Sequence, residues 1–240
     1  MERKNFLKQS IAALGMAFVV HIANSCKKDD TTTSTTTDGD GTETGTDTCT
    51  VAPSETEGPF PTKNPSAYER NDITDGRTGY KLTANITIGQ VSKSCAALAG
   101  AIVDIWHCDA EGNYSEYGGS NMQSTNYTSV HFLRGRQTTD SNGLVSFTTI
   151  FPGWYSGRAT HIHVHVYDAS GNSLKVTQIA FPETTGSALL AVNGYSKGMS
   201  GYTYNANDNV FSDDKSGVEI ATVTGTTANG FTLTMKVNVP

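Results

Sequence analysis

The sequence predicts an all-β fold, an antiparallel sandwich or barrel with long loops and little helix. Short runs rich in valine, isoleucine, threonine and aromatic residues recur between clusters of glycine, aspartate, asparagine and serine. Helical periodicity is scarce, and regularly spaced short strands of this kind are typical of antiparallel sandwiches and barrels. The predicted strands cover residues 80–88, 101–107, 144–150, 161–167, 176–181 and 231–239.

Three local patterns describe the connections between these strands. The segment Asp140-Ser-Asn-Gly143 separates 136–139 from 144–147 and predicts a hairpin turn. Residues 187–193, with Ala-Leu-Leu-Ala near their centre, are the one stretch that predicts a short helix. Residues 195–214 are rich in glycine, asparagine, tyrosine and aspartate, and we expect a long ordered loop there.

The N-terminus predicts export. A basic start with Arg3 and Lys4 precedes the mostly apolar run 11–22, which is too short to span a bilayer and has the shape of a secretory signal. The run ends in Ile-Ala-Asn-Ser-Cys26, which resembles a bacterial lipobox. We therefore expect residues 1–25 to be a lipoprotein signal peptide and Cys26 to carry lipid; ordinary signal cleavage is the alternative.

Residues 26–48 follow this signal and are built almost entirely of threonine, aspartate, glycine, glutamate and serine. Such a tract buries no apolar surface, so we expect a disordered, solvated tether. Residues 49–240 are then one domain. Lipid, tether and domain in this order predict an exported bacterial lipoprotein, anchored to a membrane in the periplasm or at the cell surface.

Charge and cysteine content narrow the chemistry further. The formal net charge is −6 without a basic stripe, which argues against a nucleic-acid partner. With lipid on Cys26, three cysteines remain, and one disulfide plus one buried thiol is the simplest arrangement in an exported protein. Cys49 and Cys95 both lie in loop-like sequence, so we favour that pair and leave Cys108 as the thiol.

Three imidazoles share one face of a predicted strand. His161, His163 and His165 alternate with apolar residues, which is the period of a β-strand. Strand residues two apart are roughly 6.6 Å apart, so two imidazoles can converge on one ion. Imidazoles alone suit zinc, copper, iron or nickel, and a zinc or copper site built on all three histidines is one possible arrangement.

Two nearby phenols change the choice of metal. Tyr155 follows a Pro-Gly-Trp turn, and Tyr114 follows the turn at residues 109–112; Tyr117 has the same chemistry and rivals it. A phenol titrates near pH 10, so its ligation at neutral pH requires a strongly acidic metal such as ferric iron. A zinc or copper site on the three histidines would leave both phenols without a role.

Four stretches carry a family resemblance. They are Thr56-Glu-Gly-Pro-Phe60, Gly100-Ala-Ile-Val-Asp-Ile-Trp-His-Cys-Asp-Ala-Glu-Gly-Asn-Tyr114-Ser, Phe132-Leu-Arg-Gly-Arg-Gln137 and Phe151-Pro-Gly-Trp-Tyr155-Ser-Gly-Arg158-Ala-Thr-His161-Ile-His163. In this order, over about residues 49–239, they resemble the intradiol ring-cleavage dioxygenases, and among these the compact exported members. The resemblance implies an antiparallel β-sandwich that holds a non-haem Fe(III) ion.

The resemblance also implies a role for individual residues. The implied iron ligands are two tyrosinates and two histidines, namely Tyr114, Tyr155, His161 and His163. Tyr155 matches the tyrosinate that leaves the iron when substrate binds. Arg158 matches the arginine that steadies charge on the substrate ring, and Gln178 a glutamine on the oxygen side of the pocket. His165 matches no ligand, so we interpret it as a structural or outer contact.

The implied activity is cleavage of a catechol-type aromatic diol by O2, with both oxygen atoms entering a cis,cis-muconate-type dicarboxylic acid. The alternative is a catalytically silent β-sandwich module that binds catechols, ferric catecholates or carbohydrate at the cell surface. Retention of all four ligand positions together with Arg158 and Gln178 favours the enzyme.

Overall fold

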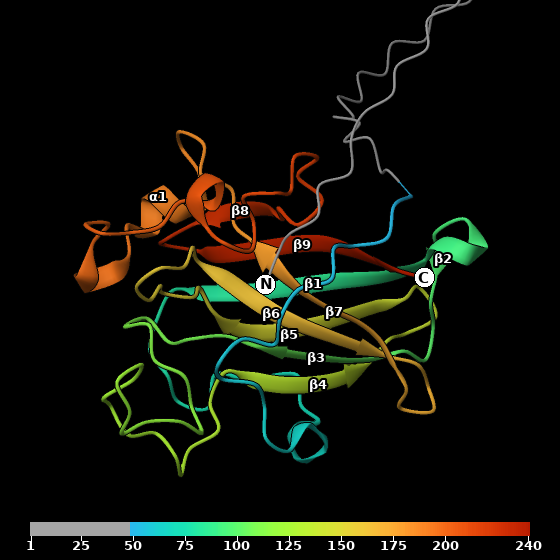
Figure 1. The fold of residues 1–240 in the computed structure, drawn as a ribbon, viewed down its shortest axis with the longest axis horizontal. Coiled ribbons are helices and arrows are strands. Elements are labelled where there is room, and N and C mark those ends of the chain that lie inside the picture. The colour runs from blue at the N-terminus through green and yellow to red at the C-terminus, as the bar shows by residue number, and fades with distance from the viewer. Residues whose placement is uncertain (1–48) are drawn as a thin grey trace, which may run out of the picture. The chain divides into compact units, whose positions relative to one another are not determined.

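The computed structural model describes residues 49–240, which form two β-sheets packed face to face (Figure 1). The predicted signal peptide 1–25, the lipid-bearing Cys26 and the tether 26–48 lie outside the described residues. Within the described range, no helix is long and apolar enough to cross a membrane.

The strands form one five-stranded sheet and one four-stranded sheet. The first contains β1 (Lys81–Gln90), β2 (Ala96–Ala97), β5 (Leu144–Ile150), β8 (Thr222–Thr226) and β9 (Gly230–Val239). The second has the order β4 (Arg134–Thr138), β3 (Ile102–Trp106), β6 (His161–Tyr167) and β7 (Ser173–Ala180). All pairings are antiparallel except that of β1 with β9, which is parallel. The predicted β-sandwich with little helix is confirmed.

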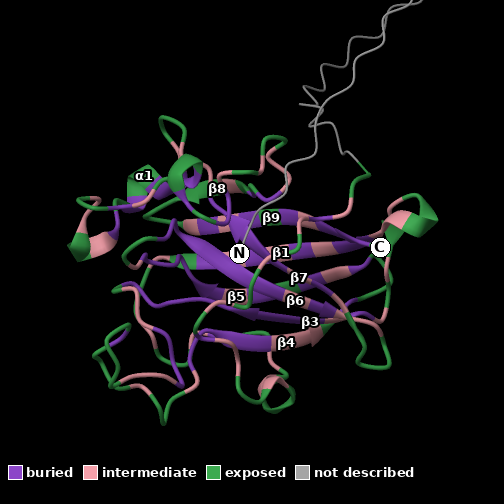
Figure 2. Ribbon diagram, viewed as in Figure 1, coloured by how far each residue is buried: buried purple, intermediate pink, exposed green. Residues whose placement is uncertain are grey.

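The core lies between the sheets, whose central strands are largely buried (Figure 2). Its fully buried side chains include Leu82, Ala84 and Ile86 of β1, Val103 and Ile105 of β3, and Ile162, Val164 and Val166 of β6. Because neighbouring side chains of a strand point to opposite faces, His161 and His163 leave β6 on the outer face of the second sheet. That outer face carries the candidate site.

The six predicted strands are present, and the short helix is confirmed as α1 (Ala188–Val192). Its N-terminus is capped by Ser187, whose Oγ accepts a hydrogen bond from the backbone N–H of Leu190. Short 3₁₀ turns cover Pro65–Tyr68, Val91–Lys93, Tyr195–Lys197 and Asn205–Asn207, the last two inside the predicted loop 195–214. The predicted disulfide between Cys49 and Cys95 is present, and Cys108 is a buried free thiol.

The predicted hairpin at residues 140–143 is wrong in one respect. The turn forms, with Asp140 Oδ1 accepting from two backbone N–H groups, but β4 and β5 enter different sheets. The side-chain amide of Gln137 donates to the carbonyl of Ser146 at 2.6 Å and accepts from its N–H at 3.2 Å. These two bonds occupy a backbone position on β5 that a paired strand would otherwise fill.

Candidate metal centre

A row of side chains crosses the outer face of the second sheet. Strand register places Arg134, Trp106, His163 and Gln178 on four adjacent strands in this order. The indole ring of Trp106 is parallel to the imidazole of His163, at 3° and with 4.9 Å between ring centroids. The row therefore fixes the plane of one histidine ring before any ligand is considered.

The two histidines direct their Nε2 atoms toward each other and toward a phenol. His161 Nε2 lies 3.1 Å from His163 Nε2 and 3.2 Å from the hydroxyl oxygen of Tyr114. On the other side of the His161 ring, Nδ1 lies 2.6 Å from the carbonyl oxygen of Ala159, so Nδ1 carries the proton and donates it. The Nε2 lone pair of His161 is then free to bind a cation, which is the usual arrangement of a ligating histidine.

Tyr114 is brought to the histidines by a turn and two side-chain clamps. Asp109 Oδ1 accepts from the N–H of Asn113 at 2.8 Å and closes the turn that ends β3. The Gln123 amide accepts from the N–H of Tyr114 at 2.6 Å and donates to its carbonyl at 2.8 Å. The ring of Phe60 stacks on that of Tyr114 with centroids 4.8 Å apart. Tyr114 is completely buried as a result.

Tyr155 is presented by a second turn, which packs on the first. The N–H of Gly153 donates to the carbonyl of Asp109 at 3.1 Å. A Cβ at Gly153 would lie 2.4 Å from the carbonyl oxygen of Ala110, so only glycine allows this close approach. The ring centroid of Tyr155 lies 5.8 Å from that of Tyr114 and 5.7 Å from that of His161.

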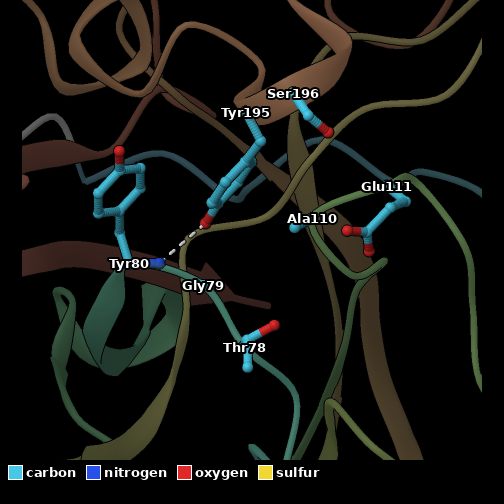
Figure 3. Close-up of a pocket in the computed structure, with 7 residues that line it drawn as sticks. All are labelled: Thr78, Gly79, Tyr80, Ala110, Glu111, Tyr195 and Ser196. Carbon is cyan, nitrogen blue, oxygen red and sulfur yellow. Dashed lines mark hydrogen bonds between the residues drawn. The ribbon is translucent and has the colours of Figure 1, made fainter.

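A separate hollow of about 350 Å³ lies beside the turn at residues 109–113, which contributes Ala110 and Glu111 to its lining (Figure 3). It is lined by Thr78, Gly79, Tyr80, Ala110, Glu111, Tyr195 and Ser196. The hydroxyl of Tyr195 accepts from the N–H of Tyr80 at 3.2 Å and donates to the carbonyl of Phe151 at 2.7 Å. This hollow contains none of the predicted site residues. Its Tyr195 holds the backbone at Phe151, just before the turn that presents Tyr155.

Burial sets the protonation of the four donors. Desolvation lowers the pKa of His161 to about 3 and holds that of His163 well below its usual value, so both imidazoles are neutral. Desolvation also raises the pKa values of Tyr114 and Tyr155, although the guanidinium of Arg158 opposes the rise at Tyr155. Ionised phenolates at neutral pH therefore require a strongly acidic cation at this position.

The donor set fits a ferric ion better than a zinc ion. Donor atoms that bind one ion at about 2.1 Å lie roughly 3.0 to 3.4 Å apart, from octahedral to tetrahedral angles. The observed 3.1 and 3.2 Å separations fit a shared ion, and the phenols favour ferric iron because a strongly acidic cation is needed to hold a phenolate. In residues 49–240, no group of three or more histidine, cysteine, aspartate or glutamate side chains could hold a metal. A metal held at this position by three or more protein side chains would therefore need donors of another type, which the two phenols offer.

His165 and Tyr117 have other partners. His165 lies with Nδ1 3.0 Å from Glu57 Oε1 and Nε2 2.8 Å from Ser173 Oγ, and its ring stacks on Tyr167. These contacts support the structural role and give no basis for a three-histidine zinc or copper site. The hydroxyl of Tyr117 donates to a backbone carbonyl, that of Pro61, at 2.7 Å. Tyr114 is thus the phenol that reaches the histidines.

Arg158 and Gln178, the two other residues that the family resemblance implied, lie together beside the histidines. Arg158 Nη2 donates to Gln178 Oε1 at 2.6 Å, and Gln178 Nε2 donates to the carbonyl of Thr56 at 2.9 Å. Arg158 Nη1 lies 3.5 Å from the hydroxyl oxygen of Tyr155. The guanidinium therefore faces the metal centre with one nitrogen while its other donors are engaged.

Sequence reasoning missed Asp208, whose carboxylate pairs with Arg158. Asp208 Oδ2 accepts from Arg158 Nε at 2.9 Å, and Asp208 is fully buried. Its local signal is weak: Oδ1 accepts from the N–H of Val210 at 2.8 Å, an Asx turn that any loop aspartate can form. Nothing in the sequence shows that this turn meets an arginine 50 residues away.

The sequence and the fold are similar to those of known dioxygenases. A family model described as Dioxygenase matches residues 56–190, which is more than half of the 240-residue chain. An intradiol ring-cleavage dioxygenase from Tetranychus urticae is 27% identical, with a TM-score of 0.68 over 80% of this chain and 95% of that protein. No curated protein matches the sequence.

Two further solved structures are similar in fold. The dioxygenase domain of a dioxygenase carbohydrate-binding protein fusion from Streptomyces sp. SirexAA-E is 24% identical, with a TM-score of 0.55 over 79% of this chain and 97% of that one. A 3-chlorocatechol 1,2-dioxygenase from Rhodococcus opacus 1CP is 19% identical, with a TM-score of 0.52 over 78% of this chain and 72% of that one.

Proposed function

Because this chain belongs to the intradiol ring-cleavage dioxygenase family, we propose that it is a non-haem Fe(III) enzyme. The proposed reaction is cleavage of a catechol-type aromatic diol by O2 between its two hydroxylated carbons. Both oxygen atoms enter the product, a cis,cis-muconate-type dicarboxylic acid.

One observation supports this proposal most strongly, the convergence of two phenol rings and two buried imidazoles. Tyr114, Tyr155, His161 and His163 would hold the ion, with Tyr114 Oη and both Nε2 atoms already within 3.2 Å of a neighbouring donor. When bound, Fe(III) supplies a Lewis acid and a template for the two adjacent oxygens of a catechol.

The two tyrosines have different surroundings, which suggests different duties. Tyr114 is completely buried and clamped at both backbone groups by Gln123, so it is suited to stay in place. Tyr155 is only partly buried and is followed by exposed Ser156 and Gly157, so it has room to move. We assign to the phenolate oxygen of Tyr155 the uptake of one catechol hydroxyl proton.

Arg158 is the residue placed to stabilise negative charge on the substrate ring. Its guanidinium is largely buried, where an electrostatic interaction is stronger than in water. Gln178 holds Nη2, so Nη1 remains for the substrate side. The buried rings of Trp106, Phe60 and Tyr114 pack together as one cluster, and those of Trp106 and Tyr114 lie against His163.

The test uses the purified full-length chain loaded with Fe(III). We expect the burgundy colour of tyrosinate-to-iron charge transfer, a shift of that band when catechol binds, and oxygen uptake with at least one member of a catechol panel. Tyr155→Phe should retain iron but lose most of the uptake. Colour and catechol binding without any oxygen uptake by the unaltered chain would instead indicate a silent binding module.

We also propose that the chain is a lipoprotein held at a membrane through Cys26. The support is the sequence alone, namely the lipobox-like Ile-Ala-Asn-Ser-Cys26 followed by a polar tract. Intact mass and membrane fractionation test this, because Cys26→Ser should release the protein from the membrane fraction. An unmodified Cys26, or a start of the mature chain at another residue, would contradict it.

A further inference from the structure

The loop at residues 195–214 brings the carboxylate of Asp208 to Arg158, beside the candidate metal centre. The carboxylate is completely buried and accepts from three different groups. Arg158 Nε donates to both oxygens, at 2.9 and 3.2 Å, and the backbone N–H groups of Ala159 and Val210 donate at 2.6 and 2.8 Å. We propose that Asp208 is a positioning residue that orients both Arg158 and His161, an inference that rests on the proposed function.

The first part of the argument concerns the guanidinium of Arg158. An arginine has many rotamers, and a buried one needs its charge paired and its donors satisfied. Asp208 holds the Nε edge and Gln178 holds Nη2 at 2.6 Å. Nη1 is then directed toward Tyr155, whose hydroxyl lies 3.5 Å away, a separation too long for a strong hydrogen bond. Nη1 is therefore the donor that remains for the substrate.

The second part concerns the imidazole of His161. Asp208 Oδ2 accepts from the N–H of Ala159, and the carbonyl of the same alanine accepts from His161 Nδ1 at 2.6 Å. By fixing Ala159, Asp208 helps to keep the proton on Nδ1 and the Nε2 lone pair toward the other donors. The carboxylate of Asp208 thus orients both the proposed metal ligand His161 and the guanidinium of Arg158.

The loop itself is anchored so that Asp208 cannot easily withdraw. Glu183 accepts from the hydroxyl of Tyr202 at 3.1 Å and from the N–H of Asn205 at 2.9 Å. The N–H of Asp208 donates to the carbonyl of Asn205 at 3.2 Å, and the hydroxyl of Tyr202 accepts from the N–H of Thr160 at 3.0 Å. These bonds connect the loop to Thr160, next to Ala159, and to Glu183, just after the end of β7.

The test is a double-mutant cycle with Asp208→Asn and Arg158→Ala on the iron-loaded full-length chain. Asp213→Asn is the matched control, because it removes one negative charge from the same loop at an exposed position. Four quantities are measured for each variant: kcat, catechol affinity without oxygen, the position of the iron absorption band, and the melting temperature.

We expect Arg158→Ala to lower kcat about 100-fold, as when one electrostatic donor is lost, and Asp208→Asn about tenfold, because it misplaces that donor without removing it. Because Asp208 acts on the ring charge through Arg158, its substitution should add less than a threefold effect on kcat in the Arg158→Ala background. It should still shift the absorption band there, through His161. Asp213→Asn should leave kcat, the catechol affinity and the absorption band unchanged.

Chemical rescue gives a second, independent measurement. Guanidinium at a low, non-denaturing concentration should restore part of the turnover of Arg158→Ala, because Asp208 still offers a site for it. The same salt should not rescue the double variant. If Asp208→Asn fails to fold, Asp208→Glu replaces it; the longer side chain should displace the guanidinium and lower kcat at a nearly unchanged melting temperature.

The outcomes separate the two claims. Independent, multiplicative effects of the two substitutions on kcat, or an unshifted band in Asp208→Asn, would overturn the positioning role while leaving the dioxygenase intact. An unaltered chain that binds catechol without consuming oxygen would overturn the proposed enzymatic activity. The catechol affinities measured without oxygen would then decide the role of Asp208, because independent effects of the two substitutions on affinity would overturn it. A chain that binds neither iron nor catechol would overturn both.

Discussion

Replacing Gly58 with alanine tests whether the N-terminal segment of the domain rests directly on a metal ligand. Gly58 has a φ of +66°, and a Cβ built there would lie 2.9 Å from Cε1 and 3.3 Å from Nε2 of His163. The segment is held on one side by the bond from Gln178 to Thr56, and on the other by the stacking of Phe60 on Tyr114. It has little freedom to withdraw, so the added methyl group should push the imidazole instead.

The magnitude has two parts that a matched variant separates. Alanine in the left-handed region costs about 1 kcal/mol, and crowding in a packed site adds roughly 1–3 kcal/mol. Gly76 has a φ of +78° but nothing within 4 Å of its added Cβ, so Gly76→Ala has only the first cost. We therefore expect the free energy of unfolding of Gly58→Ala to be roughly 1–3 kcal/mol below that of Gly76→Ala.

Iron titration followed by absorbance, alongside thermal unfolding, gives both quantities. Displacing a ligand ring should weaken iron binding roughly tenfold or more in Gly58→Ala, and Gly76→Ala should bind iron as the unaltered chain does. Equal stability losses in the two variants with unchanged iron affinity would refute the reasoning, because the segment would then not contact His163 in solution.

Three further predictions concern other parts of the molecule. Cys49→Ser opens a disulfide that joins residues 46 apart, so denaturant unfolding should show a loss of about 4 kcal/mol; a loss below about 1 kcal/mol would mean that the loop is already ordered in the unfolded chain. Burial, reinforced by the charge of Glu55, raises the pKa of Glu219 from 4.5 to about 8. The folded protein thus keeps a proton that the unfolded chain releases, so the free energy of unfolding should fall as the pH rises from about 5 to 8. Glu219→Gln should flatten this pH dependence and raise the free energy of unfolding by roughly 1–3 kcal/mol at pH 9. An unchanged pH dependence in the variant would refute the raised pKa of Glu219. Tyr114→Phe should abolish most of the ferric colour, whereas Tyr117→Phe should keep it and cost only about 1 kcal/mol; the reverse result would exchange their roles.

The sequence predicted the parts of the fold that depend on short-range patterns. Alternation of polar and apolar residues located β6 with its correct ends, and with it the shared face of His161 and His163. The turn chemistry of Asp140 to Gly143 was also read correctly. The partner of the following strand was not, because a turn leaves open which sheet each strand enters, and that choice is made by packing at β1.

In the candidate site, too, the residues that carry a sequence motif were predicted, and the residue that depends on a distant contact was not. Tyr114 and Tyr155 came from the family resemblance, and the structure brings both rings to within 6 Å of each other's centroids. The resemblance also favoured Tyr114 over its rival Tyr117, and in the structure the Tyr117 hydroxyl donates to the carbonyl of Pro61 instead. Asp208 had only the weak local signal of an Asx turn, because its importance lies in a contact with Arg158 across the fold.

The most direct test of the central claim is single-turnover cleavage under isotopically labelled oxygen. The iron-loaded full-length chain is mixed with a catechol, and the product is analysed by mass spectrometry. An intradiol dioxygenase gives one dicarboxylic acid that contains both atoms of the same O2 molecule, and Tyr155→Phe gives little of it. Oxygen uptake that yields quinone or peroxide without label in a ring-opened acid would contradict the account.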